Sequence, residues 1–288
     1  MPDRHWPAVF CLLLAATLWG IFWYPLRLLE QQGLAGVWST LLIYSGTSVV
    51  MIVMLRGRMA EFARAPGMLF AIALASGWCN TSFILAVLDG NVVRVLLLFY
   101  LSPVWATLLG WLLLREELSR GALLVLVLAM AGAVVMLWQP GMAYPWPQDK
   151  ADWLALSSGF TFALSNVMMR HLQHVSIYVK TASGWFGVIL VAAVLIVFSQ
   201  AELGQVSAMV IVAALLIGAV FLAVMTLSVV YGVTHLPVHR SAVILLFELV
   251  AGAVSSQLLT DEVILPREWL GGMLVMLAAY LSARQQPD

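Results

Sequence analysis

Ten apolar stretches, each long enough to cross a lipid bilayer, dominate the chain. A transmembrane helix needs about 20 predominantly apolar residues to cross roughly 30 Å of hydrocarbon. With 63% hydrophobic and 10% charged residues, the chain leaves little sequence for a soluble domain. We therefore expect an all-α fold, a polytopic membrane protein of ten transmembrane helices. The candidate spans are residues 7–29, 35–55, 67–88, 92–114, 121–138, 152–171, 177–199, 207–232, 241–260 and 268–283.

Two of these stretches resemble each other in their polar positions. Segments 94–116 and 240–262 each begin with an arginine, continue through an apolar run and end on a glutamate, 146 positions apart. Ser82 and Ser228 have the same spacing. Because each half of the chain holds an odd number of spans, the second copy must cross the membrane in the opposite direction. This pattern predicts the two inverted five-helix repeats of a secondary transporter.

The sequence divides into a first repeat at 1–140, an outer linker at 141–151 and a second repeat at 152–288. The linker is rich in proline and glycine, which favour turns. Short connections assigned to one side of the membrane hold ten Lys and Arg residues, against four on the other side, and such an excess is typical of cytoplasmic loops. We expect both termini to be cytoplasmic, in an inner (plasma) membrane of bacterial type. The ten are Arg4, Arg56, Arg58, Arg64, Arg115, Arg120, Arg170, Lys180, Arg240 and Arg284, and the four are Arg27, Arg94, Lys150 and Arg267.

Several function classes are disfavoured by what the sequence lacks. It has no P-loop for an ATPase, and its 14 basic and 14 acidic residues give no excess positive charge for nucleic acid. An enzyme of a known class would be indicated by a G-x-S-x-G motif, an H-E-x-x-H motif or paired intramembrane aspartates. The sequence contains none of these. A ring of like charges, as in a channel, is not evident. The sequence predicts no cofactor and no metal site, and we interpret His171, His174, His235 and His239 as surface residues.

Glu248 is the acidic residue placed deepest in the hydrocarbon, near the middle of the ninth span. An ionised carboxylate at that depth costs roughly 3 kcal/mol on insertion scales. It should therefore be protonated, or face water and a cationic partner. Glu248 is a candidate to accept a substrate ammonium or to exchange a proton. The alternative is a neutral carboxyl that is hydrogen-bonded between helices.

Aromatic side chains gather near the predicted membrane midplane. Trp19, Trp78 and Trp105 lie too deep for the interfacial belt of aromatic residues, and Trp23 and Tyr100 lie about one turn from two of them. Aromatic rings at this depth can line a cavity and bind substrate. For any single ring, ordinary helix packing is an equally good explanation.

Polar side chains also fall inside apolar spans. Asn80 lies in the third span, and Ser165 with Asn166 lies in the sixth. Because an unpaired polar group is costly in hydrocarbon, these side chains must find partners. They are candidate substrate-binding residues, or they form hydrogen bonds that hold helices together.

Further positions suggest moving parts. Pro103 removes a backbone donor inside the fourth span and predicts a kink or hinge. Arg94 and Arg240 stand at span entrances on opposite faces, where each could pair with a gate carboxylate or extend to the interface. Glu116 and Glu262 end the two copies and could cap neighbouring helices.

Short motifs along the chain resemble those of the drug/metabolite transporter superfamily, in particular its EamA-type exporters. The resembling segments are Trp19-Gly20, Tyr100-Leu101-Ser102-Pro103, Leu114-Arg115-Glu116-Glu117-Leu118-Ser119, Phe162-Ala163 and Asp261-Glu262. One position departs from the family pattern, because Glu248 is followed by Leu249 where the family often has Glu-Pro. Without that proline, a hinge in the ninth span is in doubt.

The resemblance implies ten helices around a central cavity that opens alternately to either side, with walls drawn from helices 1, 3, 4, 6, 8 and 9. The sequence is most similar to the branch that exports amino acids, including aromatic ones. The implied partners are a small-molecule substrate, either an amino acid or an organic cation, the lipid bilayer and, as a candidate coupling ion, the proton. A multidrug or other metabolite exporter of the same superfamily remains the alternative.

Overall fold

The computed structural model describes residues 5–34, 36–90, 92–138, 147–200, 202–260 and 264–284, and these residues form helices and no strand. The first half contains α1 (His5–Gln31), α2 (Gly36–Met54), η1 (Met59–Arg64), α3 (Pro66–Asp89), α4 (Val92–Phe99), α5 (Ser102–Leu114) and α6 (Arg120–Leu137). The second half contains α7 (Lys150–His171), α8 (Ile177–Ser199), α9 (Ala208–Leu216), η2 (Ile217–Leu222), α10 (Ala223–His235), α11 (Val238–Leu245), α12 (Phe247–Leu259) and α13 (Pro266–Arg284). Most of the predicted linker lies outside the described residues.

Eight helical segments of the described chain are long and apolar enough to cross a membrane. Three of them join consecutive elements: α4 with α5, α9 through α10, and α11 with α12. The predicted sixth and tenth spans correspond to α7 and α13, which are 22 and 19 residues long but are not among the eight. α7 is more polar because it carries Ser158, Ser165 and Asn166 on a buried face. The all-helical class is confirmed, whereas the ten-helix inverted repeat stays a prediction.

Two spans are interrupted near their middle. The fourth predicted span breaks between α4 and α5, at Tyr100 and Leu101, directly before the predicted hinge at Pro103. The ninth breaks between α11 and α12 at Leu246. Leu246 lies 146 positions after Tyr100, which is the spacing of the two repeat copies. The ninth span is therefore interrupted without a proline.

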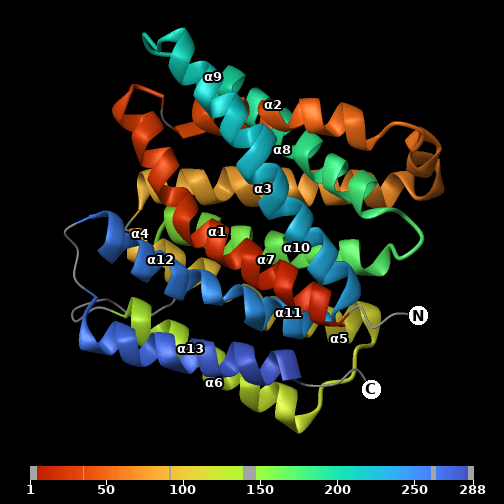
Figure 1. Ribbon diagram of the computed structural model, residues 1–288, viewed down its shortest axis with the longest axis vertical. Coiled ribbons are helices and arrows are strands. Elements are labelled where there is room, and N and C mark those ends of the chain that lie inside the picture. Colours follow the sequence, from red (N-terminus) through yellow and green to blue (C-terminus); the bar gives the residue numbers. More distant parts are fainter. Residues whose placement is uncertain are drawn as a thin grey trace.

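Helices of each half pack mainly against helices of the other half, in a corresponding pattern. α3 packs against α7 and α8, and correspondingly α1 and α2 pack against α10 and η2. α6 packs against α13 at one side of the bundle (Figure 1). The two helices approach closely because Gly132 and Gly271 face each other, and a Cβ on either glycine would lie within 2.7 Å of the other's carbonyl oxygen.

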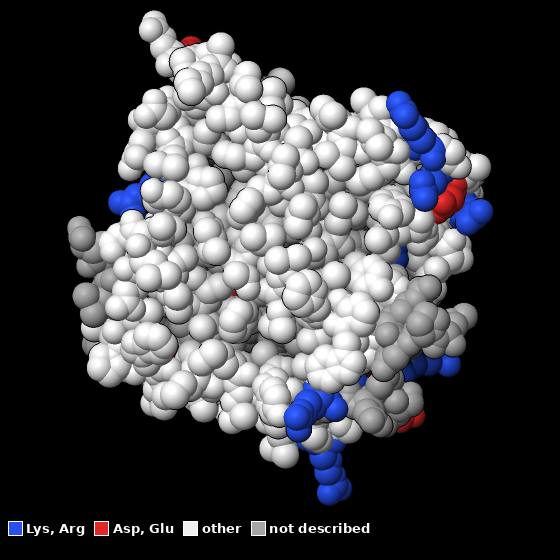
Figure 2. Space-filling model, in the orientation of Figure 1, with Lys and Arg blue, Asp and Glu red and all other residues white. Residues whose placement is uncertain are grey.

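The first and last helices meet at one end of the bundle. His5 Nε2 lies 2.6 Å from the carbonyl oxygen of Ala283, so α1 begins where α13 ends (Figure 1). We call this the terminal end. Figure 2 shows Lys and Arg side chains gathered at the right-hand and lower edges of this view, whereas the broad middle carries almost no charge.

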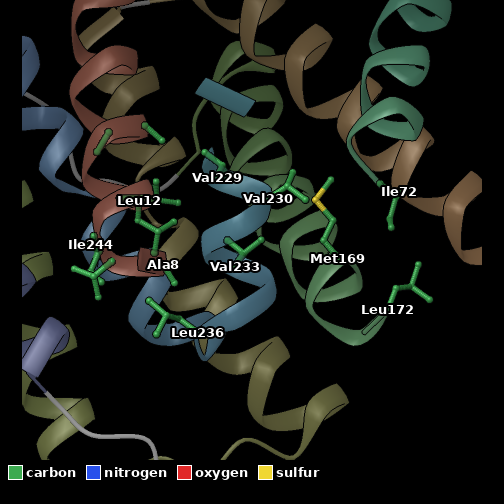
Figure 3. Packing of buried hydrophobic residues seen from close by; sticks show 14 of the residues in the cluster. Ala8, Leu12, Ile72, Met169, Leu172, Val229, Val230, Val233, Leu236 and Ile244 are labelled. Carbon is green, nitrogen blue, oxygen red and sulfur yellow. The ribbon is translucent and has the colours of Figure 1, made fainter. Parts of the chain in front are cut away.

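The hydrophobic core is densest towards the terminal end. Ala8 and Leu12 of α1 lie beside Val233 of α10 and Ile244 of α11, and the same buried cluster extends across to Leu172, directly after α7, as Figure 3 shows. All five side chains are buried. α1 belongs to the first half of the chain, and the other three elements belong to the second half. This cluster therefore packs the two halves against each other towards the terminal end.

Candidate functional site

A cavity of about 210 Å³ lies between the two halves. Its walls come from α1 through α5 and from α7, α8, α10, α11 and α12. Both helix breaks contribute, because Tyr100 and Leu246 line it together with the residues around them. A pocket between transporter halves, formed by interrupted helices, is where secondary transporters bind their substrates.

Glu248 lines this cavity and lies at the start of a helix. The break at Leu246 creates a new helix start, and Glu248 lies in the first turn of α12. A carboxylate is stabilised at a helix N-terminus by the aligned peptide dipoles. The side chain of Glu248 also forms a hydrogen bond with Tyr100, at the other break. The local fold therefore presents an acidic group to the cavity, and none of the described residues forms a salt bridge with it.

Amide and hydroxyl groups form a polar strip on the cavity wall. Asn80 Oδ1 accepts a hydrogen bond of 2.9 Å from the Tyr44 hydroxyl, and its Nδ2 donates to the Ser76 carbonyl at 3.0 Å. Ser165 donates to the Phe162 carbonyl at 2.9 Å. Asn166 is buried and also lines the cavity.

Aromatic rings make up much of the remaining wall. Phe99 contacts Tyr100 and Phe83 edge-on, with ring centroids 5.3 and 5.0 Å apart, and it lies 5.7 Å from Phe162. Trp185 lines the opposite half and is 1% exposed, and its indole N–H has no hydrogen-bond partner among the described residues. An unpaired buried donor is costly, so this N–H is available to an incoming acceptor.

Seven of the residues singled out in the sequence come together at this cavity, and three others do not. The lining includes Trp19, Asn80, Tyr100, Pro103, Ser165, Asn166 and Glu248. Trp23, Trp78 and Trp105 are not among the described residues that line it. A role in binding substrate stays a prediction for six of these residues, and Pro103 stays a predicted hinge.

Each excluded tryptophan has a different contact. Trp23 donates to the Ser255 hydroxyl at 2.9 Å, and Trp105 packs edge-on against Phe160 with ring centroids 5.7 Å apart. Trp78 is 45% exposed and donates to the Ser157 hydroxyl at 3.2 Å. Residues 76, 80 and 83 of α3 lie on one face of the helix, and this face lines the cavity. Residue 78 lies on a different face.

Other cavity residues were not found from the sequence. Tyr44, Phe99, Phe162 and Trp185 line the wall, although only Phe162 carried any signal, as part of the family motif. The described residues include no group of three or more His, Cys, Asp and Glu side chains that could hold a metal.

The predicted gate arginines have different surroundings. Arg94 of α4 forms an ion pair with Asp152 of α7, with Nε 2.7 Å from Oδ2, at the end opposite the termini. Both side chains are largely buried, so this contact joins the two halves away from water. Arg240 on α11 is also buried, and its carbonyl accepts a hydrogen bond of 3.5 Å from Ser282. Both arginines are thus largely enclosed by protein, and a gating role for each stays a prediction.

Glu116 caps a helix of the other half, as the sequence suggested. Its Oε2 accepts the backbone N–H of Val238, the first residue of α11, at 2.9 Å. His239 Nδ1 lies 3.3 Å from the same oxygen and is buried, so the interpretation of His239 as a surface residue is wrong. The reason is that α11 is enclosed by α1, α5 and α13. Glu262 lies outside the described residues.

Known proteins resemble this chain over most or part of its length. The EamA-like transporter family is matched over residues 6–138 and 149–284. An uncharacterized transporter, PA0485, from Pseudomonas aeruginosa is 30% identical over 159 residues, and this alignment spans about half of each chain (51% of this one and 50% of the relative). A solved crystal structure with 17% identity has the same fold, with a TM-score of 0.75 over 96% of both chains. The chain therefore belongs to the EamA-like transporter family.

Proposed function

We propose that the protein is an inner-membrane secondary transporter that exports amino acids, including aromatic ones, by alternating access. The observation that carries this proposal is the cavity between the halves, with the Glu248 carboxyl at a helix break and aromatic rings around it. A carboxylate can bind the ammonium group of an amino acid, and the rings of Trp19 and Phe99 can stack on an aromatic side chain.

The other end of an amino acid also needs a partner. The indole N–H of Trp185 and the amide of Asn166 are donors on the cavity wall that could bind a carboxylate.

A second candidate function, export of organic cations, is favoured by the charge of the lining. Glu248 is the one Asp, Glu, Lys, Arg or His among the described lining residues, so a cation without a carboxylate also suits the cavity.

Charge distribution and helix packing support the predicted topology and the repeat. Lys and Arg gather at the terminal end, which suits a cytoplasmic position for both termini. The two breaks at the repeat spacing, and the corresponding packing between the halves, support two oppositely oriented five-helix units that would rock against each other around the cavity.

The experiment is a flux assay in liposomes that contain the purified protein. Labelled amino acids and organic cations are screened for saturable uptake and for exchange against internal substrate, with and without a proton gradient. We expect saturable exchange of aromatic amino acids. If organic cations are exchanged and amino acids are not, the protein exports organic cations and the amino acid proposal is wrong. Flux that neither saturates nor shows exchange would contradict a carrier.

A further inference from the structure

Two similar contacts join the halves at the terminal end of the molecule. Glu116 of the first half accepts the backbone N–H of Val238, which begins α11 in the second half. Glu61 of η1 accepts the backbone N–H of Ser176, the N-cap of α8, at 2.8 Å. In both contacts a carboxylate of one half meets the positive end of a helix dipole in the other.

The local backbone directs Glu116 towards α11. Arg115 ends α5 with a left-handed conformation, φ 55°, that residues other than glycine rarely adopt. The chain turns back so that the Glu116 N–H donates to the Gly110 carbonyl at 3.2 Å. Gly110 leaves space for the side chain, because a Cβ there would lie 3.2 Å from Glu116 Oε2 and 3.6 Å from Val238.

The charges around Glu116 come from the second half. Besides Val238 and His239 of α11, Arg170 of α7 places its Nε 3.6 Å from Oε1. Arg170 is held in turn by a hydrogen bond of 2.6 Å to the Thr234 carbonyl at the end of α10. Separation of the halves at this end would remove all of these partners from one carboxylate. Glu116 therefore stabilises the closed arrangement through several interactions at once.

Helix α11 connects this contact to the cavity. All eight of its residues are buried. Ala242 and Leu245 on this helix line the cavity, and α11 ends at Leu245, three positions before Glu248. A short, fully packed helix moves as a unit, so a restraint on its first residue also restrains the cavity wall at its far end.

We propose that Glu116 is a positioning residue that holds α11 closed across the terminal end of the cavity, and that this carboxylate must release α11 before the cavity opens there. The inference rests on the alternating access of the proposed function. It adds a residue that controls access from one end only, remote from the cavity-lining residues that would contact substrate.

A native cysteine allows a direct test. Cys79 lines the cavity, and replacing Cys11 by serine makes it the single thiol of the chain. The full-length protein is reconstituted in sealed vesicles, and a membrane-impermeant thiol reagent is added from one side or the other. The side that bears the termini is identified by an epitope placed at the C-terminus. The readout is the labelling rate of Cys79 from each side.

Glu116→Gln is compared with Glu117→Gln, the same change at the neighbouring exposed position. Loss of charge-assisted hydrogen bonds should raise labelling from the terminal side about tenfold in Glu116→Gln, with slower labelling from the opposite side. Glu117→Gln should match the parent protein. Gly110→Ala keeps the charge but places a Cβ 3.2 Å from Glu116 Oε2, so that the carboxylate must shift by a few tenths of an ångström. It should act in the same direction as Glu116→Gln.

Unchanged labelling from both sides in Glu116→Gln and Gly110→Ala would overturn the proposal. Faster labelling from both sides with a lower Tm would also overturn it, because a merely structural role has no preferred side. The assay uses no substrate. A parent protein that transports nothing, but still shows the one-sided change, would therefore refute the proposed function and leave the role of Glu116 intact.

Discussion

Arg94 and Asp152 form a buried ion pair that joins α4 to α7 at the end opposite the termini. Arg94 Nε lies 2.7 Å from Oδ2 and 2.8 Å from Oδ1 of Asp152, whose side chain is 3% exposed. Asp152 Oδ2 also accepts the backbone N–H of Gln148 at 2.8 Å. The two halves are thus held together by charge at this end, as they are by Glu116 at the terminal end.

Asp152→Asn should destabilise the protein strongly, because it leaves the buried guanidinium of Arg94 without its counter-charge. Removing one partner of a buried pair costs about 3–5 kcal/mol. Asp89→Asn is a matched control, since Asp89 pairs with Lys150 at 3.7 Å and both side chains are at least half exposed. Exposed pairs contribute about 0–1 kcal/mol. Thermal unfolding in detergent measures both, and equal losses of Tm would show that the buried pair has no special role.

The contact between Glu61 and Ser176 predicts a pH dependence. The backbone N–H of Ser176 lowers the pKa of the Glu61 carboxyl, and Arg64 and Arg58 add to this effect. A lowered pKa in the folded state means that the contact stabilises above the usual glutamate pKa of about 4.3 and is lost as pH falls through the lowered value. The Tm difference between the parent and Glu61→Gln should therefore be largest at neutral pH, where the carboxylate is ionised, and should vanish in strong acid. A difference that grows in acid would contradict this assignment.

Two tryptophans at similar depth separate cavity residues from packing residues. Trp19 lines the cavity, whereas Trp78 is half exposed and hydrogen-bonded to Ser157. Trp19→Ala should change the preference between aromatic and aliphatic substrates by about tenfold, the scale of one aromatic contact. Trp78→Ala should leave the preference unchanged. Competition for uptake into liposomes gives the ratio, and equal effects would assign Trp19 to packing.

Glu248→Gln distinguishes two roles of the cavity carboxyl. If Glu248 carries a coupling proton, the variant should lose uptake driven by a pH gradient while keeping exchange, because glutamine cannot release a proton. If Glu248 only binds the ammonium, both activities should weaken together. Liposome flux with and without the gradient separates the two results. Unchanged pH dependence in the variant would refute proton coupling through this residue.

Much of the cavity could be predicted because certain residues are conspicuous at their depth in the sequence. Glu248 stands out as a charge within an apolar span, and Asn80 and Asn166 stand out as amides within apolar spans. The break near Pro103 follows from the loss of a backbone donor. The break at Leu246 could not be found in this way, since no proline or glycine marks it and only the repeat spacing gives its position.

Residues that face the cavity through helix rotation were harder to find. In spans that are apolar on all sides, the sequence has little periodicity to show which face points inwards. Trp78 was therefore assigned to the cavity although α3 presents Ser76, Asn80 and Phe83 there, and Tyr44 and Trp185 were overlooked. Their orientation depends on packing between helices distant in the sequence, which one sequence does not reveal.

Passage of substrate through the cavity between the halves can be tested by filling that cavity. Gly184 lines it, and a Cβ at this position would contact Ser76 and Met169, whereas a Cβ at Gly67 would meet open space. Exchange of a labelled aromatic amino acid is measured in liposomes with Gly184→Phe and Gly67→Phe proteins of equal monodispersity. We expect loss of exchange in Gly184→Phe and normal exchange in Gly67→Phe. Normal exchange in a folded Gly184→Phe protein would contradict passage through the cavity.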